Sequence, residues 1–232
     1  MLSGFTKTLD GTSIRSFVRP AIDITPVLDP FKEWGPTTEL TVKKLTSKLC
    51  WLLAVSRFLR DSEIQRIDDK RTRIIQVVLN LVIVAPKEKR AGQTIEKPFQ
   101  ISSHTDPILC PILAYTVYKE KMASTLCPTP RTNNSKCIFN RILRLINESS
   151  KLLSVYSISR HIRSISDLIR RDPDKPIPKD RAIGTTLAAN SGVPSDEIDM
   201  HEFWSNYYIF DTYYRLTRNS SNNLTESILN LE

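Results

Sequence analysis

Two arginines, a tryptophan and a pair of tyrosines are the residues of this chain best suited to chemistry on a phosphate. Arg60 stands in a turn that continues Asp-Ser-Glu-Ile, and Arg181 lies at the start of a predicted helix. A guanidinium is a planar fork that holds two phosphate oxygens at once, a geometry that lysine cannot match. Further along, Trp204 is followed by Tyr213 and Tyr214. A tyrosine oxygen can attack a phosphorus atom held by two arginines, so we expect chemistry on a phosphate ester.

A long predicted helix leads to Arg60 and must position it. Thr41 is suited to cap this helix, because its hydroxyl can accept a hydrogen bond from the first turn. Residues 42–58 then carry apolar side chains at helical spacing, which predicts the central core helix. After Arg60, either Asp61 or Ser62 can cap a second, short helix.

Arg181 follows a stiff, proline-rich linker over 172–180 and begins a predicted helix, turn and short helix over 180–194. We therefore expect a mostly α-helical fold with one small three-stranded antiparallel sheet. The other predicted elements are a short helix over 29–35 with Asp29 as its cap and Pro30 in its first position, two strands between 71 and 85, a third strand over 98–101, a helix from Pro111, a loop over 125–136, a short helix over 138–146, a helix from a Ser157 cap through Ile169, and a final helix over 225–231.

Length and charge favour one domain that binds a polyanion. The chain has 232 residues, 40% of them hydrophobic, which suffices for one core with a small appendage. Its formal net charge is +8 and its pI is about 9.4. Nucleic acid is the commonest partner of so basic a chain, and a solvated basic surface is the alternative.

Cysteine and histidine usage gives no reason to expect a metal or another cofactor. The four cysteines form no Cys-x-x-Cys pair, and the chain has only three histidines. Thiols of this kind indicate a reducing compartment. The sequence shows no signal peptide and no apolar run long enough to cross a membrane, so we expect an intracellular protein without a membrane partner. The cysteines are Cys50, Cys110, Cys127 and Cys137.

Taken in order along the chain, these residues resemble the catalytic domain of tyrosine recombinases, the phage-integrase family. The similarity covers roughly 38–218 and is greatest to the versions in fungal DIRS-like and Crypton mobile elements. In this family an arginine follows a long apolar helix in an Arg-x-Ser-Glu-Leu-like turn, which Arg60 matches. A second arginine stands eleven residues before a Gly-Val pair, as Arg181 does before Gly192.

The resemblance also selects a lysine and a nucleophile. The family carries a lysine on a β-hairpin, which Lys87 or Lys89 matches in the predicted basic turn. It then has a histidine or tryptophan nine residues before the tyrosine nucleophile. Trp204 and Tyr213 have this spacing, which favours Tyr213 over Tyr214.

What the resemblance implies is DNA strand cleavage and rejoining through a 3′-phosphotyrosyl intermediate, without a cofactor or metal. Arg60 and Arg181 would hold the non-bridging oxygens, and the hairpin lysine would protonate the departing 5′-oxygen. Trp204 would donate its indole N–H to the phosphate or pack the site. Double-stranded DNA is the implied partner, and the remaining basic residues would neutralise its backbone.

One departure from the family pattern concerns acid–base catalysis. Pro178 stands three residues before Arg181, where the family has a histidine. Proline has no side-chain donor or acceptor, and losing a general acid or base typically costs ~10²–10⁴ in rate. Lys179 is a poor substitute. The other histidines near in sequence are His161, which we expect to contact solvent or DNA, and His201.

The predicted organisation is an N-terminal extension over 1–37, a catalytic-type domain over 38–218 and a C-terminal tail helix within 219–232. The extension is too short for the helical core-binding domain that such recombinases usually carry. The tail helix could dock on a neighbouring protomer, giving a homo-oligomer, or on its own chain.

Three functions remain open at this point. They are an active recombinase, a DNA-binding module whose catalysis Pro178 impairs, and a decayed mobile-element remnant. A nuclear location follows from the resemblance only if the source is eukaryotic.

Overall fold

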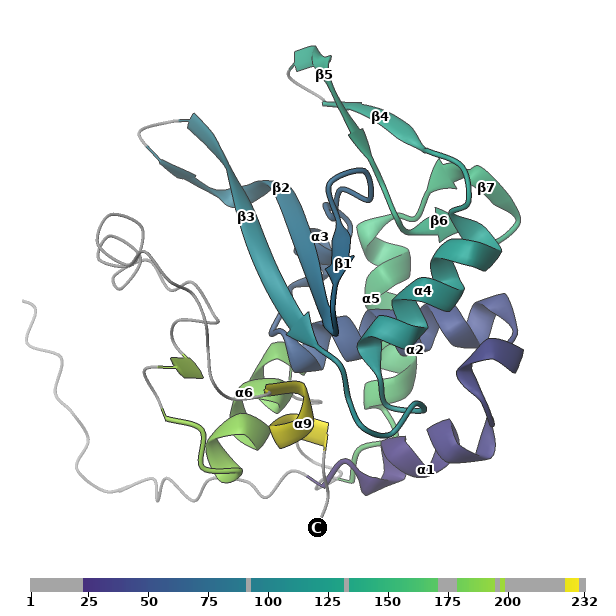
Figure 1. Cartoon of the computed structure of the whole chain (residues 1–232), viewed down its shortest axis with the longest axis vertical. Helices are drawn as coiled ribbons and strands as arrows, with labels where there is room; N and C mark the ends of the chain where they lie inside the picture. Colours follow the sequence, from purple (N-terminus) through teal and green to yellow (C-terminus); the bar gives the residue numbers. More distant parts are fainter. Residues whose placement is uncertain are drawn as a thin grey trace, which may run out of the picture.

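The computed structural model describes residues 23–90, 93–131, 134–170, 179–194, 197–198 and 224–229. Figure 1 shows helices gathered beside an antiparallel sheet, with a separate β-hairpin above them. This is the expected fold class, mostly α-helical with small antiparallel sheets. Among the described residues, no helix combines the length and the apolar composition that crossing a membrane requires.

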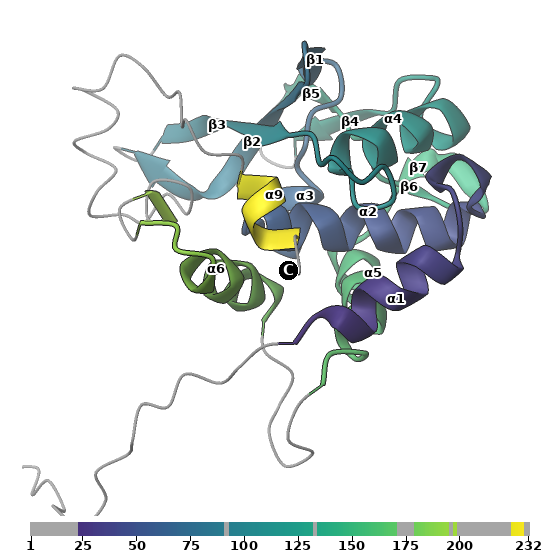
Figure 2. The same ribbon diagram turned by 60° about the horizontal axis from the view of Figure 1, so that its bottom comes forward.

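Helix α2 (Val42–Ser56) is the centre of the core, as the sequence predicts. The Thr41 hydroxyl accepts a hydrogen bond from the Lys44 N–H at 3.4 Å and so caps it. Every residue from Leu45 to Ser56 is buried, so the helix is covered on all sides. It packs against α4 (Pro111–Met122), α5 (Val155–Ser166), α6 (Asp180–Asn190) and α9 (Leu224–Leu229), as Figure 2 shows.

The three-stranded sheet has the order β1-β2-β3, with strands Arg73–Ile75, Val78–Arg90 and Gln93–Ser102. In β2, Leu79, Leu81 and Ile83 are buried, which is the alternation expected of a strand with one face on the core. The pairing of β2 with β3 shifts register between Val84 and Lys89. The three predicted strands are confirmed, and the hairpin extends further than its propensities indicate.

The segment after α4 differs from prediction. The structure has two hairpins where a loop over 125–136 and a helix over 138–146 were expected: β4 (Pro128–Arg131) with β5 (Asn134–Asn140), and β6 (Arg144–Leu145) with β7 (Glu148–Leu152). Arg144 gives the physical reason, because it is fully buried. Its guanidinium donates to three main-chain carbonyls, those of Arg141 at 2.7 Å, Thr125 at 2.8 Å and Ser149 at 3.0 Å. These tertiary hydrogen bonds outweigh the helix-like spacing of the apolar residues.

The boundaries of two other helices also differ from the predicted ones. Helix α1 (Thr25–Glu33) starts before the predicted 29–35 and contains Pro30 in its interior, with Pro26 in its first turn. Helix α5 ends at Ser166 and is capped by Ser154, whose hydroxyl accepts from the Ser157 N–H at 3.1 Å. Both helices therefore begin earlier than predicted. Ser157, which was expected to cap α5, instead lies in its first turn.

Helix α9 docks on its own chain. It contacts α6, α2 and β3, and Figure 2 shows it between them. Glu226 accepts a hydrogen bond from the Thr105 N–H at 3.1 Å, which ties the helix to the loop after β3.

Lys48, on α2, generates a prediction about stability. Its side chain is fully buried; its ammonium donates to the Thr37 hydroxyl at 2.9 Å and lies 5.4 Å from the centre of the Phe31 ring. Burial lowers the pKa of Lys48 to about 8, although the charges of Asp106 and Cys110 act in the opposite direction. Below this pKa the folded protein holds a desolvated charge that the unfolded chain leaves in water, so Lys48 lowers stability there.

We expect Lys48→Met to raise the free energy of unfolding at pH 7 by about 2 kcal/mol, allowing for the lost hydrogen bond to Thr37. Between pH 8 and 10.5 the unfolded lysine is protonated while the folded one is neutral, so the advantage of the variant should shrink as pH rises. Denaturant unfolding of both proteins at pH 7, 8.5 and 10 measures this difference. A constant difference across these pH values would show that the charge of Lys48 is not the cause.

Candidate active site

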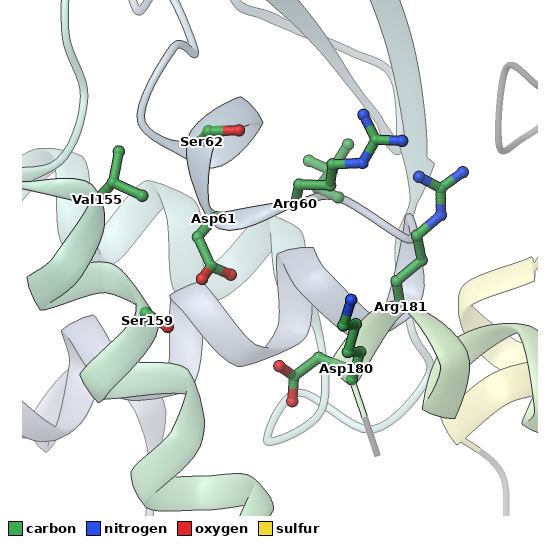
Figure 3. Close-up of a pocket in the computed structure, with 9 residues that line it drawn as sticks. Arg60, Asp61, Ser62, Val155, Ser159, Asp180 and Arg181 are labelled. Carbon is green, nitrogen blue, oxygen red and sulfur yellow. The ribbon is translucent and has the colours of Figure 1, made fainter. Parts of the chain in front are cut away.

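A pocket of about 690 Å³ lies where three segments meet: the turn between α2 and α3 (Asp61–Ile64), the first turns of α5, and the start of α6. Figure 3 shows its lining side chains. Both arginines singled out in the sequence are among them. The full lining is Leu59, Arg60, Asp61, Ser62, Val155, Ser159, Lys179, Asp180 and Arg181.

Arg60 and Arg181 reach this pocket from two different elements. Arg60 is the residue before α3, and Arg181 is the second residue of α6. In Figure 3 both guanidinium groups point the same way. Two guanidinium groups that line one pocket have the chemistry needed to hold a tetrahedral oxyanion such as a phosphate.

The turn that carries Arg60 is fixed by a buried ion pair. The Arg60 N–H donates to Glu63 Oε2 at 2.9 Å, so Arg60 itself, rather than the predicted Asp61 or Ser62, occupies the cap position of α3. The other carboxylate oxygen of Glu63 lies 3.8 Å from Lys97 Nζ on β3, and both side chains are almost wholly buried. The sheet thereby holds the turn in place.

Lys97 is a positioning residue that the sequence analysis did not single out. A signal for it exists, because Lys97, Phe99 and Ile101 alternate along β3 and therefore share its inward face. A lysine on the buried face of a strand requires an acidic partner, and Glu63 supplies it.

The first turn of α6, which carries Arg181, is held by a chain of side-chain hydrogen bonds. Trp51 on α2 donates its indole N–H to the Ser166 hydroxyl at 3.1 Å, and Ser166 on α5 donates to Asp180 Oδ1. Burial raises the pKa of Asp180, while the hydrogen bond from Ser166 acts to lower it and the charge of Asp61 acts to raise it. Three helices thus meet one residue before Arg181.

Gly184 sets the distance between α6 and α2. A Cβ atom at this position would overlap the Val55 carbonyl oxygen and lie 2.8 Å from Phe58 Cδ1. Phe58 itself has a φ of 56°, a left-handed conformation that ends α2 and turns the chain toward Arg60. The close crossing and the turn together bring the two arginines to one pocket.

The structure does not describe the side chains of the other predicted site residues. Lys87 and Lys89 lie on β2 near its hairpin end, where Lys89 pairs with Thr94, but their side chains are outside the described residues. The predicted sites Trp204 and Tyr213, and the Pro178 position, are also outside them.

His161 does not take the place of the histidine that the family pattern expects. Its imidazole is half-buried and shares a 2.7 Å hydrogen bond with the Ser47 hydroxyl on α2, away from the pocket lining. Burial lowers the pKa of His161, and the charges of Lys43 and Arg160 lower it further. His161 thus makes an internal contact that the sequence did not predict, while part of the residue stays exposed.

Among the residues described, no group of three or more histidine, cysteine, aspartate or glutamate side chains is arranged to hold a metal ion. Three cysteines of this part of the chain, Cys50, Cys110 and Cys127, are buried free thiols.

Comparison with solved structures identifies the fold. A structure described as an FLP recombinase–Holliday junction complex matches 86% of this chain with a TM-score of 0.52 and 15% identity, and an Flpe–Holliday junction complex matches equally well. The chain has the fold of a tyrosine-recombinase catalytic domain. It spans 48% of the length of each of these recombinase chains.

Sequence comparison alone does not detect this relationship. No protein-family model matches the chain. No curated protein matches it by sequence either. The relationship is therefore visible in the fold and not in the overall sequence.

The close crossing at Gly184 gives a test of how the pocket is built. Gly184→Ala should force α6 away from α2, lowering the free energy of unfolding by about 1–3 kcal/mol through overpacking. It should also weaken anion binding, because Arg181 moves with α6. Thermal unfolding and phosphate titration measure the two effects.

Asn190→Ala is the matched control for this change, since Asn190 is exposed in the same helix. It should leave both quantities almost unchanged, because alanine suits an exposed helical position. A Gly184→Ala protein as stable as this control would show that the close approach does not constrain α6.

Asp180 gives a second test, based on pH. Its pKa is raised in the folded state, so stability should fall as pH rises from about 4 through the folded pKa. Asp180→Asn keeps an acceptor for Ser166 and removes the charge; at pH 7 it should raise Tm by about 2–4 °C, the effect of ~1 kcal/mol in a chain of this size.

The gain should disappear near pH 3.5, where the carboxyl is protonated in both states. Asp29→Asn removes a charge from an exposed position on α1 and is the control. Equal Tm shifts for the two variants at pH 7 would contradict a special role for Asp180.

Proposed function

We propose that this chain binds double-stranded DNA and cleaves and rejoins its strands as a tyrosine recombinase, through a 3′-phosphotyrosyl intermediate. The observation that carries the proposal is the meeting of Arg60 and Arg181 in one pocket. The net charge of +8 supports a DNA partner, as does a fold matched in FLP recombinase–Holliday junction complexes.

The proposed reaction exchanges one phosphate ester for another. The Tyr213 oxygen attacks the phosphorus, the bond from phosphorus to the 5′-oxygen breaks, and the tyrosine proton leaves to a base. Arg60 and Arg181 hold the non-bridging oxygens as negative charge gathers on them. Lys87 or Lys89 gives a proton to the departing 5′-oxygen, and Trp204 donates to or packs the phosphate. Attack by a second 5′-hydroxyl reverses these steps and joins new ends.

Pro178 supports a second candidate, a DNA-binding module with impaired catalysis. At the position where the family pattern has a histidine, proline can neither accept the tyrosine proton nor contact the phosphate. A module of this kind keeps the arginine pocket and the basic surface, and loses only turnover. A decayed mobile-element remnant would lose DNA binding as well.

The finer assignments rest on the same proposal. A catalytic-type domain over 38–218, an N-terminal extension before it and a C-terminal tail after it follow the predicted motif order. The recombinase proposal also includes three finer assignments. They are a relationship to the recombinases of DIRS-like and Crypton elements, a nuclear location if the source is a eukaryote, and a homo-oligomer formed through the tail helix.

A nicked suicide duplex taken from sequence flanking the gene tests the proposal. We expect a covalent protein–DNA adduct that is lost in Tyr213→Phe and kept in Tyr214→Phe. Arg60→Lys and Arg181→Lys should reduce its rate by ~10²–10³, because lysine keeps the charge and loses the fork. An adduct that survives Tyr213→Phe would refute this nucleophile.

The substitution Pro178→His separates the two candidates. Restoring the expected histidine should raise the adduct rate by ~10²–10⁴ if its absence limits catalysis. DNA binding with no adduct in the natural chain, and an adduct in Pro178→His, would identify the impaired module.

A further inference from the structure

A second pair of arginines, outside the pocket, lies where two sheets meet. Residues 66–69 lie beside β2: the Val84 N–H donates to the Arg66 carbonyl at 3.1 Å, and the Asp68 N–H donates to the Val82 carbonyl at 2.9 Å. Along its other edge this segment joins the β4–β5 hairpin, since the Asp69 N–H donates to the Asn140 carbonyl at 2.7 Å.

The geometry of this segment places Arg66 and Arg141 near each other. Arg66 precedes the two bridged residues Ile67 and Asp68, and its charge acts on Arg141. Arg141 pairs with Asp68 in an antiparallel bridge, and residues directly opposite in such a bridge share a face. Arg141 is oriented further by Phe139, whose ring centre lies 5.2 Å from its guanidinium carbon.

Both guanidinium groups keep a buried donor without a partner. The Nη1 atom of Arg66 and that of Arg141 are each buried, and neither has a hydrogen-bond partner in the part of the chain described. A buried donor left unsatisfied costs about 1–3 kcal/mol, more when it is charged. Each side chain as a whole is only partly buried, so both residues lie at the edge of the core and not deep inside it.

Electrostatics at this position also favour an anion. Burial lowers the pKa of Arg141, and the positive charge of Arg66 lowers it further, whereas Asp68 acts to raise it. The Asp68 carboxylate already accepts from the Asn140 N–H at 3.1 Å and lies 3.5 Å from Arg71 Nε.

The neighbouring carboxylate of Asp69 is also engaged. It accepts from the Tyr115 hydroxyl at 2.7 Å and from Lys119 Nζ at 2.9 Å. Two like charges are thus held together, with the nearby acids occupied by other groups. Such an arrangement is costly unless an anion lies between the two arginines.

We propose that Arg66 and Arg141 form a phosphate-binding site separate from the pocket of Arg60 and Arg181. A phosphate offers oxygens to both guanidinium groups, satisfies the two buried donors and neutralises the like charges. Two sources share this chemistry: a backbone phosphate of a duplex, and a free phosphate-bearing small molecule.

The test is thermal unfolding of the full chain carrying Arg60→Gln and Arg181→Gln, in sodium phosphate and in sodium chloride of equal ionic strength. The double background removes the first pocket, so this test does not depend on the proposed recombinase function. Phosphate should raise Tm in this background. Adding Arg66→Met or Arg141→Met should weaken phosphate binding by about tenfold or more, the cost of losing a charged hydrogen-bond partner.

Arg170→Gln, which removes one exposed positive charge from the region after α5, is the control and should keep the full phosphate effect. Without phosphate, Arg66→Met should be at least as stable as its parent, since a like-charge contact is relieved. If a methionine variant does not fold, Arg66→Lys keeps the charge and should give an intermediate phosphate effect. The proposal is overturned if phosphate gives no stabilisation, or stabilises all variants equally.

Duplex binding followed by anisotropy at several salt concentrations identifies the source. If a DNA phosphate occupies the site, Arg66→Met lowers the slope of log K against log salt by about one. If the slope is unchanged while the phosphate effect is lost, the ligand is a small phosphate-bearing molecule.

Discussion

The contact between Gly184 and the C-terminal end of α2 is the constraint on which the pocket depends. Helix α2 is buried along almost its whole length, so it cannot move without disturbing the core. Because Gly184 has no side chain, α6 lies directly against the Val55 carbonyl and the Phe58 ring. Phe58, which limits how closely α6 can approach, is two positions before Arg60. The C-terminal end of α2 therefore determines where both arginines lie.

Polar groups buried next to this contact make the arrangement specific. Apolar packing alone leaves helices free to slide by small amounts, whereas a buried hydrogen bond has one favourable geometry. Glu63 uses both of its oxygens, one on the Arg60 N–H and the other near Lys97. Ser166 similarly accepts from Trp51 and donates to Asp180. Each arginine is therefore adjacent to a residue that loses hydrogen bonds if the backbone shifts.

Local signals in the sequence were sufficient where a single residue decides the structure. Thr41 caps α2 and Pro111 begins α4 as predicted, because capping and proline chemistry act within one turn. The dense β-branched run around β2 was likewise interpreted correctly. The pairing of Arg60 with Arg181 in one pocket was predicted from motif order, and the structure brings the two together.

Long-range partners decided the features that the sequence analysis missed. The spacing within 138–146 favours a helix, yet buried Arg144 requires three carbonyls from different segments, and hairpins provide them. The alternation along β3 indicates that Lys97 is on the buried face, but it does not identify Glu63 as the partner of Lys97. A pattern within one window cannot report a partner that lies elsewhere in the chain.

The two arginines are positioned by different parts of the core, and the pocket lies where these parts meet. Arg60 belongs to a turn tied to the sheet by Glu63 and Lys97, while Arg181 belongs to a helix tied to α2 and α5 by Asp180. An anion held by both arginines, as proposed, would therefore link the sheet to α6 across the end of α2. Such a bridge adds its binding free energy to the folded state only while both attachments are intact. It follows that the affinity of the pocket is a property of the packing around Phe58 and Gly184 as much as of the two guanidinium groups.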